Sequence, residues 1–196
     1  MKKVKLFIAS SLDGYIARKD ESIDWLFMDG DYGYAAFYES IDVIIMGRKT
    51  YTIAEKMGAN PYPGKKTFVL SRSRAGERTE DIVFTKEPLR KLVAQAEKGV
   101  WVVGGGEIVR QFLEQDLLDE LVVSIHPILL GSGILLFPPS ARELPLELTA
   151  TTVWKNGMVQ LTYVKSAGGK RPRRKGRPAR ERAARSRSKA RRNRSS

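Results

Sequence analysis

Short apolar runs alternate with amphipathic stretches along most of the chain. Short runs rich in apolar residues predict strands at residues 5–10, 43–47, 66–71, 81–85, 100–103 and 118–131, of which 43–47 and 100–103 are apolar throughout. Helical spacing, or a proline in a first turn, predicts helices at residues 32–41, 50–57, 87–98 and 107–115. Residues 147–165 read as a closing hairpin turned at Asn156-Gly157. The pattern therefore predicts an α/β fold with a mostly parallel, mixed central sheet and a C-terminal antiparallel hairpin.

The charge of the chain divides between two parts. The 196 residues carry a formal charge of +13, from 35 Lys and Arg against 22 Asp and Glu. Residues 167–196 hold 14 of the basic residues and one acid, Glu181, which leaves residues 1–166 with 21 of each sign. The basic segment has no aromatic residue and no Leu, Ile, Val or Met, so we expect a disordered tail after a domain spanning residues 1–166.

Composition narrows the classes of function. The absence of cysteine excludes disulfides and thiolate metal sites, and a single histidine, His126, excludes a multi-histidine metal site. The N-terminal apolar run LFIA is too short for a signal peptide, and no run has the length of a membrane span. We therefore expect a cytoplasmic protein without a resident metal. An alternative function is polyanion or nucleic-acid binding through the basic tail, which would be electrostatic and would leave the domain as a non-catalytic cofactor binder.

Three predicted strand ends are followed by glycines, cations or hydroxyls. They are residues 104–106 (GGG), 47–50 (GRKT) and 71–73 (SRS). Ligands of open α/β sheets bind at this edge, where helix N-termini favour phosphate groups. Taken singly, each stretch can also be a turn, a capped helix start or an ordinary polar loop. Their occurrence together indicates a polyphosphorylated ligand lying across the sheet.

These motifs, in this order, resemble the dihydrofolate reductase-like superfamily. The resemblance covers about residues 1–166 and rests on LFIASSLDGYIA, IIMGRKTY, VLSRS and VVGGGEIVRQFL. The segment HPILLGSGILLF (126–137) is similar to the riboflavin biosynthesis reductase domain and its stand-alone bacterial relatives, more than to dihydrofolate reductase proper. The resemblance implies a three-layer fold and an NADPH-dependent reductase.

What the resemblance implies about the cofactor can be carried over residue by residue. The implied NADPH-binding residues are Ala9 and Ile16 beside the nicotinamide; Gly47, Arg48, Lys49 and Thr50 at the pyrophosphate and the 2′-phosphate side; Leu70, Ser71 and Arg72 at the adenosine ribose; and Gly104, Gly105, Gly106, Glu107 and Ile108 around the pyrophosphate. A cis peptide is implied between Gly104 and Gly105. The cations favour NADPH over NADH, because they can pair with a dianionic phosphate.

The implied reaction is hydride transfer to a planar heterocycle, either pterin-like or ribosylaminopyrimidine-like. Counting back from the MGR motif places Asp31 at the family's catalytic carboxylate, although Asp31 can equally cap the following helix. Asp13 is expected to shape a turn, Asp29 is a weaker candidate for the substrate site, and His126 is expected to be structural. The resemblance also implies a possible homodimer, for which the apolar ILLF segment is the candidate interface.

Overall fold

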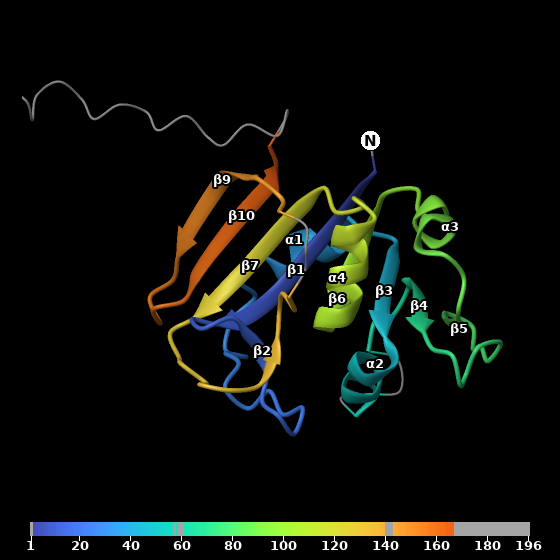
Figure 1. Ribbon diagram of the computed structural model, residues 1–196, viewed down its shortest axis with the longest axis horizontal. Helices are drawn as coiled ribbons and strands as arrows, with labels where there is room; N and C mark the ends of the chain where they lie inside the picture. The colour runs from blue at the N-terminus through green and yellow to red at the C-terminus, as the bar shows by residue number, and fades with distance from the viewer. Residues whose placement is uncertain (1, 57, 59–60, 140–142, 167–196) are drawn as a thin grey trace, which may run out of the picture.

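A twisted eight-stranded sheet forms the middle layer of the domain (Figure 1). The computed structural model describes residues 2–56, 58, 61–139 and 143–166, so the basic tail lies outside the described residues. The sheet order is β5-β4-β3-β6-β1-β7-β10-β9. Its strands are β1 (Lys3–Ser11), β3 (Val43–Gly47), β4 (Lys66–Leu70), β5 (Ile82–Thr85), β6 (Gly99–Gly104), β7 (Glu120–His126), β9 (Leu146–Val153) and β10 (Val159–Lys165).

In the order of the sheet, the neighbouring strands β5, β4, β3, β6, β1 and β7 are all parallel to one another. Strand β10 pairs antiparallel with both β7 and β9. This confirms the predicted α/β class, the mostly parallel mixed sheet and the closing hairpin, whose Gly157 has a φ of 86°. The helices are α1 (Tyr34–Glu39), α2 (Arg48–Glu55), α3 (Leu89–Ala94) and α4 (Gly106–Glu114). Within the described residues, none of them combines the length and apolar character needed to cross a bilayer.

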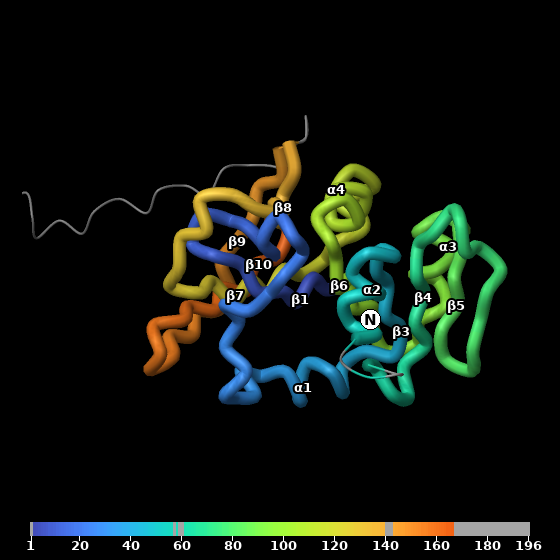
Figure 2. Tube along the Cα trace, turned by 90° about the horizontal axis from the view of Figure 1, so that it is seen from below, coloured from blue at the N-terminus to red at the C-terminus, as the bar shows by residue number. Residues whose placement is uncertain are grey.

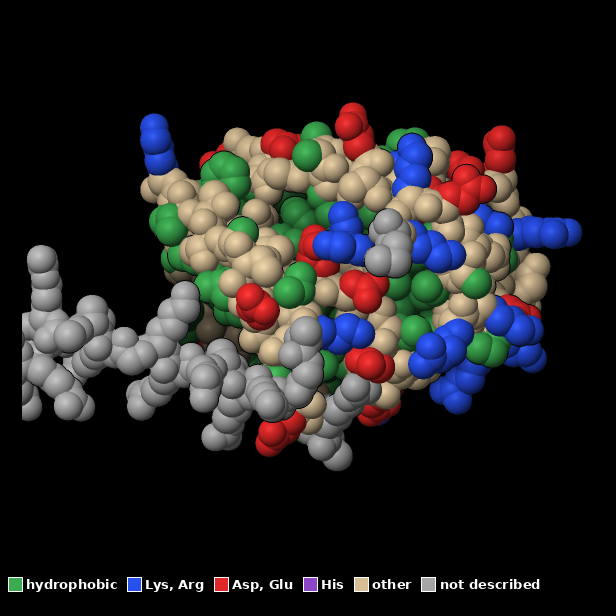
Figure 3. Space-filling view, turned by 90° about the horizontal axis from the view of Figure 1, so that it is seen from above, with side chains coloured by type: hydrophobic (Ala, Val, Ile, Leu, Met, Phe, Trp, Pro, Cys, Tyr) green, Lys and Arg blue, Asp and Glu red, His purple; other side chains and the backbone are tan. Residues whose placement is uncertain are grey.

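Apolar side chains cover both faces of the sheet, because successive residues of a strand point to opposite sides. On β3, Val43 and Ile45 join the cluster under α4, which includes Phe112. Ile44 and Met46 join the opposite cluster, together with residues of α1. Figure 2 shows α4 and α1 on opposite sides of the strands, so the domain has the three layers that the resemblance implies. On the face seen in Figure 3, basic and acidic side chains occur together, in keeping with a domain of balanced charge.

All four helices differ in extent from the sequence-based prediction. Helix α1 is shorter than residues 32–41 at both ends, and α4 is shifted by one residue from 107–115. Helix α2 begins at Arg48 and not at Thr50, because Gly47 ends β3 in extended conformation and the helix follows at once. Helix α3 ends at Ala94, well before residue 98. The carboxylate of Asp42 accepts hydrogen bonds from the backbone N–H groups of Glu97 and Gly99 at 2.7 and 2.9 Å, which directs the chain out of the helix and into β6.

A second, two-stranded sheet pairs β2 (Tyr15–Ala17) with β8 (Ile134–Leu135) and was not predicted from the sequence. Both strands are too short to show a periodic pattern. The first turn of α4 lies directly against this ribbon. A Cβ atom on Gly106 would stand 2.2 Å from the carbonyl oxygen of Leu135, so this position requires glycine.

Replacing Gly106 by alanine is expected to lower the free energy of unfolding by about 2–3 kcal/mol, since a backbone carbonyl cannot yield as a side chain can. Chemical denaturation of Gly106→Ala and Gly105→Ala measures the effect. At Gly105 a Cβ would have only ordinary contacts, the nearest being Thr50 Oγ1 at 3.5 Å. Equal losses in the two variants would show that the contact with β8 does not limit the residue at position 106.

Candidate functional site

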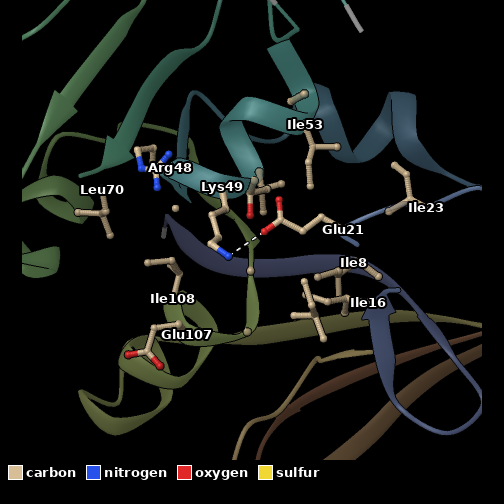
Figure 4. A pocket seen from close by; sticks show the side chains of 18 of the residues that line it. Ile8, Ile16, Glu21, Ile23, Arg48, Lys49, Ile53, Leu70, Glu107 and Ile108 are labelled. Atoms are coloured by element: carbon tan, nitrogen blue, oxygen red, sulfur yellow. Dashed lines mark hydrogen bonds and ion pairs between the residues drawn. The ribbon is translucent and has the colours of Figure 1, made fainter. Parts of the chain in front are cut away.

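A cavity of about 710 Å³ opens at the carboxyl ends of β1, β3, β4 and β6. Figure 4 shows its two sides: Arg48 and Glu107 lie toward one end, and Ile8, Ile16, Ile23 and Ile53 toward the other. The lining residues are Ile8, Ala9, Ile16, Ala17, Glu21, Ile23, Leu26, Gly47, Arg48, Lys49, Thr50, Ile53, Ala54, Tyr62, Leu70, Arg72, Val103, Gly105, Gly106, Glu107, Ile108 and Ile134. The cavity thus joins a charged region to an apolar one.

Most of the residues that the resemblance assigned to the cofactor meet in this cavity. Those that line it are Ala9, Ile16, Gly47, Arg48, Lys49, Thr50, Leu70, Arg72, Gly105, Gly106, Glu107 and Ile108. Gly104 and Ser71 do not line it. Ser71 lines an adjoining hollow of about 550 Å³, which shares Leu70, Arg72, Glu107 and Ile108 with the main cavity.

Two helices begin at the charged end of the cavity. Helix α2 starts after Gly47 and helix α4 after Gly105, and no side chain caps either helix. The first N–H groups of a helix have no acceptor within the helix, and they carry the positive end of its dipole. A pair of uncapped helix starts beside one cavity is suited to binding an anion with several charges.

The three consecutive glycines serve different purposes. Gly104 has a φ of 123°, a conformation that side chains disfavour, and the implied cis peptide between Gly104 and Gly105 is present. Gly105 lines the cavity, and Gly106 is fixed by its contact with β8. The backbone at this turn is therefore open to the cavity on one side and packed against the ribbon on the other.

The cations of the site are not equally available. Lys49 Nζ lies 2.8 Å from Glu21 Oε1 and forms an ion pair across the cavity (Figure 4). Within the described residues, no ion pair or hydrogen bond engages the guanidinium group of Arg48 or Arg72. These two arginines are the available charges for a phosphate group.

Glu107, in the first turn of α4, is paired with Arg110 and forms two hydrogen bonds with its guanidinium group. The hydrogen bonds from Arg110 lower the pKa of the Glu107 carboxyl. Arg110 also binds Glu114 one turn further on. The negative charge of Glu107 is therefore balanced within its own helix and does not exclude an anion from the helix start.

The structure shows what Asp31 contacts. Its side chain is exposed and does not line the cavity, and its carboxylate accepts hydrogen bonds from the N–H groups of Gly33 and Ala35 at 3.0 and 2.9 Å. These contacts correspond to the capping interpretation, with α1 beginning at Tyr34 and not at residue 32. A catalytic role for Asp31 stays a prediction without a contact that supports it.

The other candidate aspartates also have local partners. Asp13 accepts hydrogen bonds from Ser11 Oγ at 2.6 Å and from the backbone N–H groups of Leu130 and Gly131, and the bond from Ser11 lowers the pKa of its carboxyl. Asp13 thus shapes a turn, as expected. Asp29 accepts a hydrogen bond from the hydroxyl group of Tyr32.

Several lining residues were missed from the sequence. They are Ile8, Ala17, Glu21, Ile23, Leu26, Ile53, Ala54, Tyr62, Val103 and Ile134. The apolar ones look like ordinary core positions, and Glu21 lies in an irregular segment before α1 with no motif around it. Glu21 becomes recognisable only through its pairing with Lys49, which lies 28 residues away.

The order and direction of the strands define a dihydrofolate reductase-like fold. The chain belongs to the RibD C-terminal domain family, whose model matches residues 2–160. It is 39% identical over 173 residues to the uncharacterised protein YwjB of Bacillus subtilis, covering 84% of this chain and 99% of YwjB.

Solved structures place the fold in the same group. A Shewanella sp. PV-4 protein ascribed to riboflavin biosynthesis superposes with a TM-score of 0.74 and 30% identity, covering 84% of this chain and 99% of that one. Dihydrofolate reductase from Enterococcus faecalis, solved with NADP(H), superposes with a TM-score of 0.63 and 18% identity over 84% of this chain and 96% of its own. At that identity the likeness shows the fold alone.

Two variants separate the roles considered for Asp31. Asp31→Asn keeps one acceptor oxygen and so retains one of the two backbone hydrogen bonds, and it should lose less stability than Asp31→Ala, which loses both and about 1 kcal/mol. Thermal unfolding measures both. If Asp31→Asn keeps the fold but loses a hundredfold or more in NADPH oxidation, the expectation for a missing proton donor, then Asp31 is catalytic as well.

Proposed function

We propose that the protein is an NADPH-dependent reductase that transfers a hydride to a planar heterocycle, pterin-like or ribosylaminopyrimidine-like. One observation carries the proposal: two uncapped helix starts share one cavity with two arginines that have no partner among the described residues, and the other end of that cavity is apolar. A dinucleotide has the same division into charged phosphates and a flat, less polar ring. The family membership supports a reductase and leaves the substrate to be identified.

The residues present fit such a cofactor. The pyrophosphate would lie at the starts of α2 and α4, where the uncapped backbone N–H groups, Arg48 and the hydroxyl group of Thr50 line the cavity. The adenosine and its 2′-phosphate would occupy the adjoining hollow, which contains Ser71, Arg72 and Lys86. The nicotinamide would lie at the apolar end beside Ala9 and Ile16.

The bound cofactor would supply the hydride, and the protein would position the two rings and exclude water. Ile8, Ile16 and Ile23 form an apolar surface that displaces solvent from the reacting faces. The proton that completes the reduction would come from an ordered water, since Asp31 does not line the cavity. The homodimer and the polyanion contact of the tail stay predictions from the sequence.

Calorimetry of the full chain with NADP⁺ and NADPH tests the cofactor, and NADPH oxidation with a panel of pterins and ribosylaminopyrimidines tests the reaction. We expect heat with both nucleotides and oxidation with one class of heterocycle. Absence of heat with either nucleotide would overturn the proposal. Binding without oxidation across the panel would favour a cofactor-binding protein that lacks turnover.

Arg72→Ala and Arg48→Ala are each expected to weaken NADP⁺ binding by about 1.5–3 kcal/mol, with a much smaller effect on NAD⁺, since a charge-assisted contact to the 2′-phosphate is lost. Arg74→Ala is the matched control. Arg74 is two residues from Arg72, but it pairs with Glu77 at 2.8 Å and stacks on Phe84, away from the cavity. Equal weakening of NADP⁺ and NAD⁺ would show that neither Arg48 nor Arg72 faces the 2′-phosphate.

Glu21→Gln is expected to strengthen NADP⁺ binding by about three- to tenfold, because it releases Lys49 and removes a negative charge from the cavity. Glu120→Gln, which breaks an ion pair with Lys3 at the other end of the sheet, should leave the affinity unchanged. Calorimetry at one salt concentration measures both variants. Weaker binding by Glu21→Gln would instead show that Glu21 holds Lys49 in its binding position.

A further inference from the structure

His126 is buried at the end of β7, with only 3% of its surface exposed, and has no part in the chemistry proposed above. Its Nε2 atom accepts a hydrogen bond from the backbone N–H of Phe27 at 3.2 Å. Its Nδ1 atom lies 3.3 Å from the carbonyl oxygen of Ser124. Both contacts are hydrogen bonds only if the imidazole is neutral and carries its proton on Nδ1.

The same ring is packed between two aromatic side chains. Trp25 meets it edge to face at a centroid distance of 5.2 Å, and Phe27 lies at 4.8 Å. Trp25 is itself buried, and its indole N–H has no acceptor among the described residues. Trp25 is therefore held by packing, and His126 is one of the groups that it packs against.

These contacts anchor residues 18–33, which connect β2 to α1 without helix or strand. Ile23 and Leu26 of this segment line the cavity on either side of the anchored Trp25. Elsewhere the Glu21–Lys49 ion pair ties the segment to α2, and the Arg18–Asp24 ion pair lies within the segment. Gln160 of β10 donates to the carbonyl oxygen of Tyr32 at 3.2 Å. His126, at the end of β7, thus holds the backbone of Phe27, which directly follows the wall residue Leu26.

We propose that neutral His126 is a positioning residue that fixes Ile23 and Leu26 in the cavity wall, and that its protonation releases this wall. A protonated ring has no lone pair for the Phe27 N–H, so the hydrogen bond becomes a repulsive contact between two donors. The proposal rests on the proposed function, because this wall is the apolar end where the nicotinamide would lie.

Burial lowers the pKa of His126 below its usual value of 6.5. Above 6.5 the ring is neutral in the folded and unfolded chain, and its contacts contribute fully to stability. As the pH falls below 6.5, the unfolded chain takes up the proton first, so stability is lost progressively until the pH passes the lower pKa of the folded state.

The charged groups on the elements around the ring have partners of their own. Asp13, which follows β1, is bound by Ser11, Leu130 and Gly131. On the anchored segment, Asp20 accepts hydrogen bonds from Ser22, Glu21 pairs with Lys49, and Asp24 pairs with Arg18. Asp29 binds Tyr32, and Asp31 caps α1. Lys155 of the hairpin is exposed, and Glu120 lies at the other end of β7 and pairs with Lys3.

The test compares the full chain with His126→Gln, which can accept the Phe27 hydrogen bond but does not titrate, and with His126→Leu, which cannot accept it. NADP⁺ affinity is measured from about pH 8 down to the lowest pH at which the protein stays folded, because burial places the pKa of His126 below the ordinary range of histidine. Relative to His126→Gln, the parent should lose about three- to tenfold in affinity at the acid end, the range that one hydrogen bond supports. The Gln variant also corrects for titration of the nucleotide.

His126→Leu should bind more weakly at every pH, without the acid-dependent loss. A merely structural histidine would lower the melting temperature of this variant but would leave the pH profiles of the parent and His126→Gln parallel, which would overturn the proposal.

Tryptophan fluorescence provides a readout that does not need the nucleotide. Protonation beside Trp25 should change the emission of the parent below pH 6.5, and the change should be absent in Trp25→Phe, which retains the other two tryptophans. If NADP⁺ fails to bind at any pH, the proposed function falls while the fluorescence still reports on the anchor. If the parent and Trp25→Phe titrate alike, the anchor itself is contradicted.

Discussion

The pairing of β3 with β6 is the constraint on which the site depends. The two strands are parallel neighbours, and their register sets Met46 beside Gly104. Each strand leads directly into a helix, so the starts of α2 and α4 are brought together at one edge of the sheet. A Cβ on Gly47 would lie 3.2 Å from Ile108 of α4, which shows how closely the two helix starts approach. Neither helix could present its backbone N–H groups to the same ligand if one strand were inserted between them.

This constraint also explains how much the sequence could predict. Strands β3, β4 and β6 contain apolar runs that are followed at once by glycine, cations or hydroxyls. Both the strands and the edge that they share could therefore be inferred from the sequence. The pairing of Glu21 with Lys49 could not, since it depends on how an irregular segment folds back over α2. The β2–β8 ribbon could not be predicted for a related reason. Each of its strands has only two or three residues, too few to show a periodic pattern, and the two strands lie far apart in the sequence.

Electrostatic balance separates the groups that build the site from those available to a ligand. Glu107 is neutralised by Arg110 within α4, and Lys49 by Glu21 across the cavity. Arg48 and Arg72 have no such partner within the described residues. An anion entering the cavity therefore meets two arginines that require no exchange of partners, and one lysine that must first leave a carboxylate. Binding at the arginines avoids the cost of separating an existing ion pair.

The positions of the carboxylates also bear on the substrate. Asp13, Asp29 and Asp31 each bind groups of the surrounding fold, and within the described residues the carboxylates that line the cavity are Glu21 and Glu107. Both of these are paired with a cation. A pterin that relies on a carboxylate for recognition would find none unpaired among these residues.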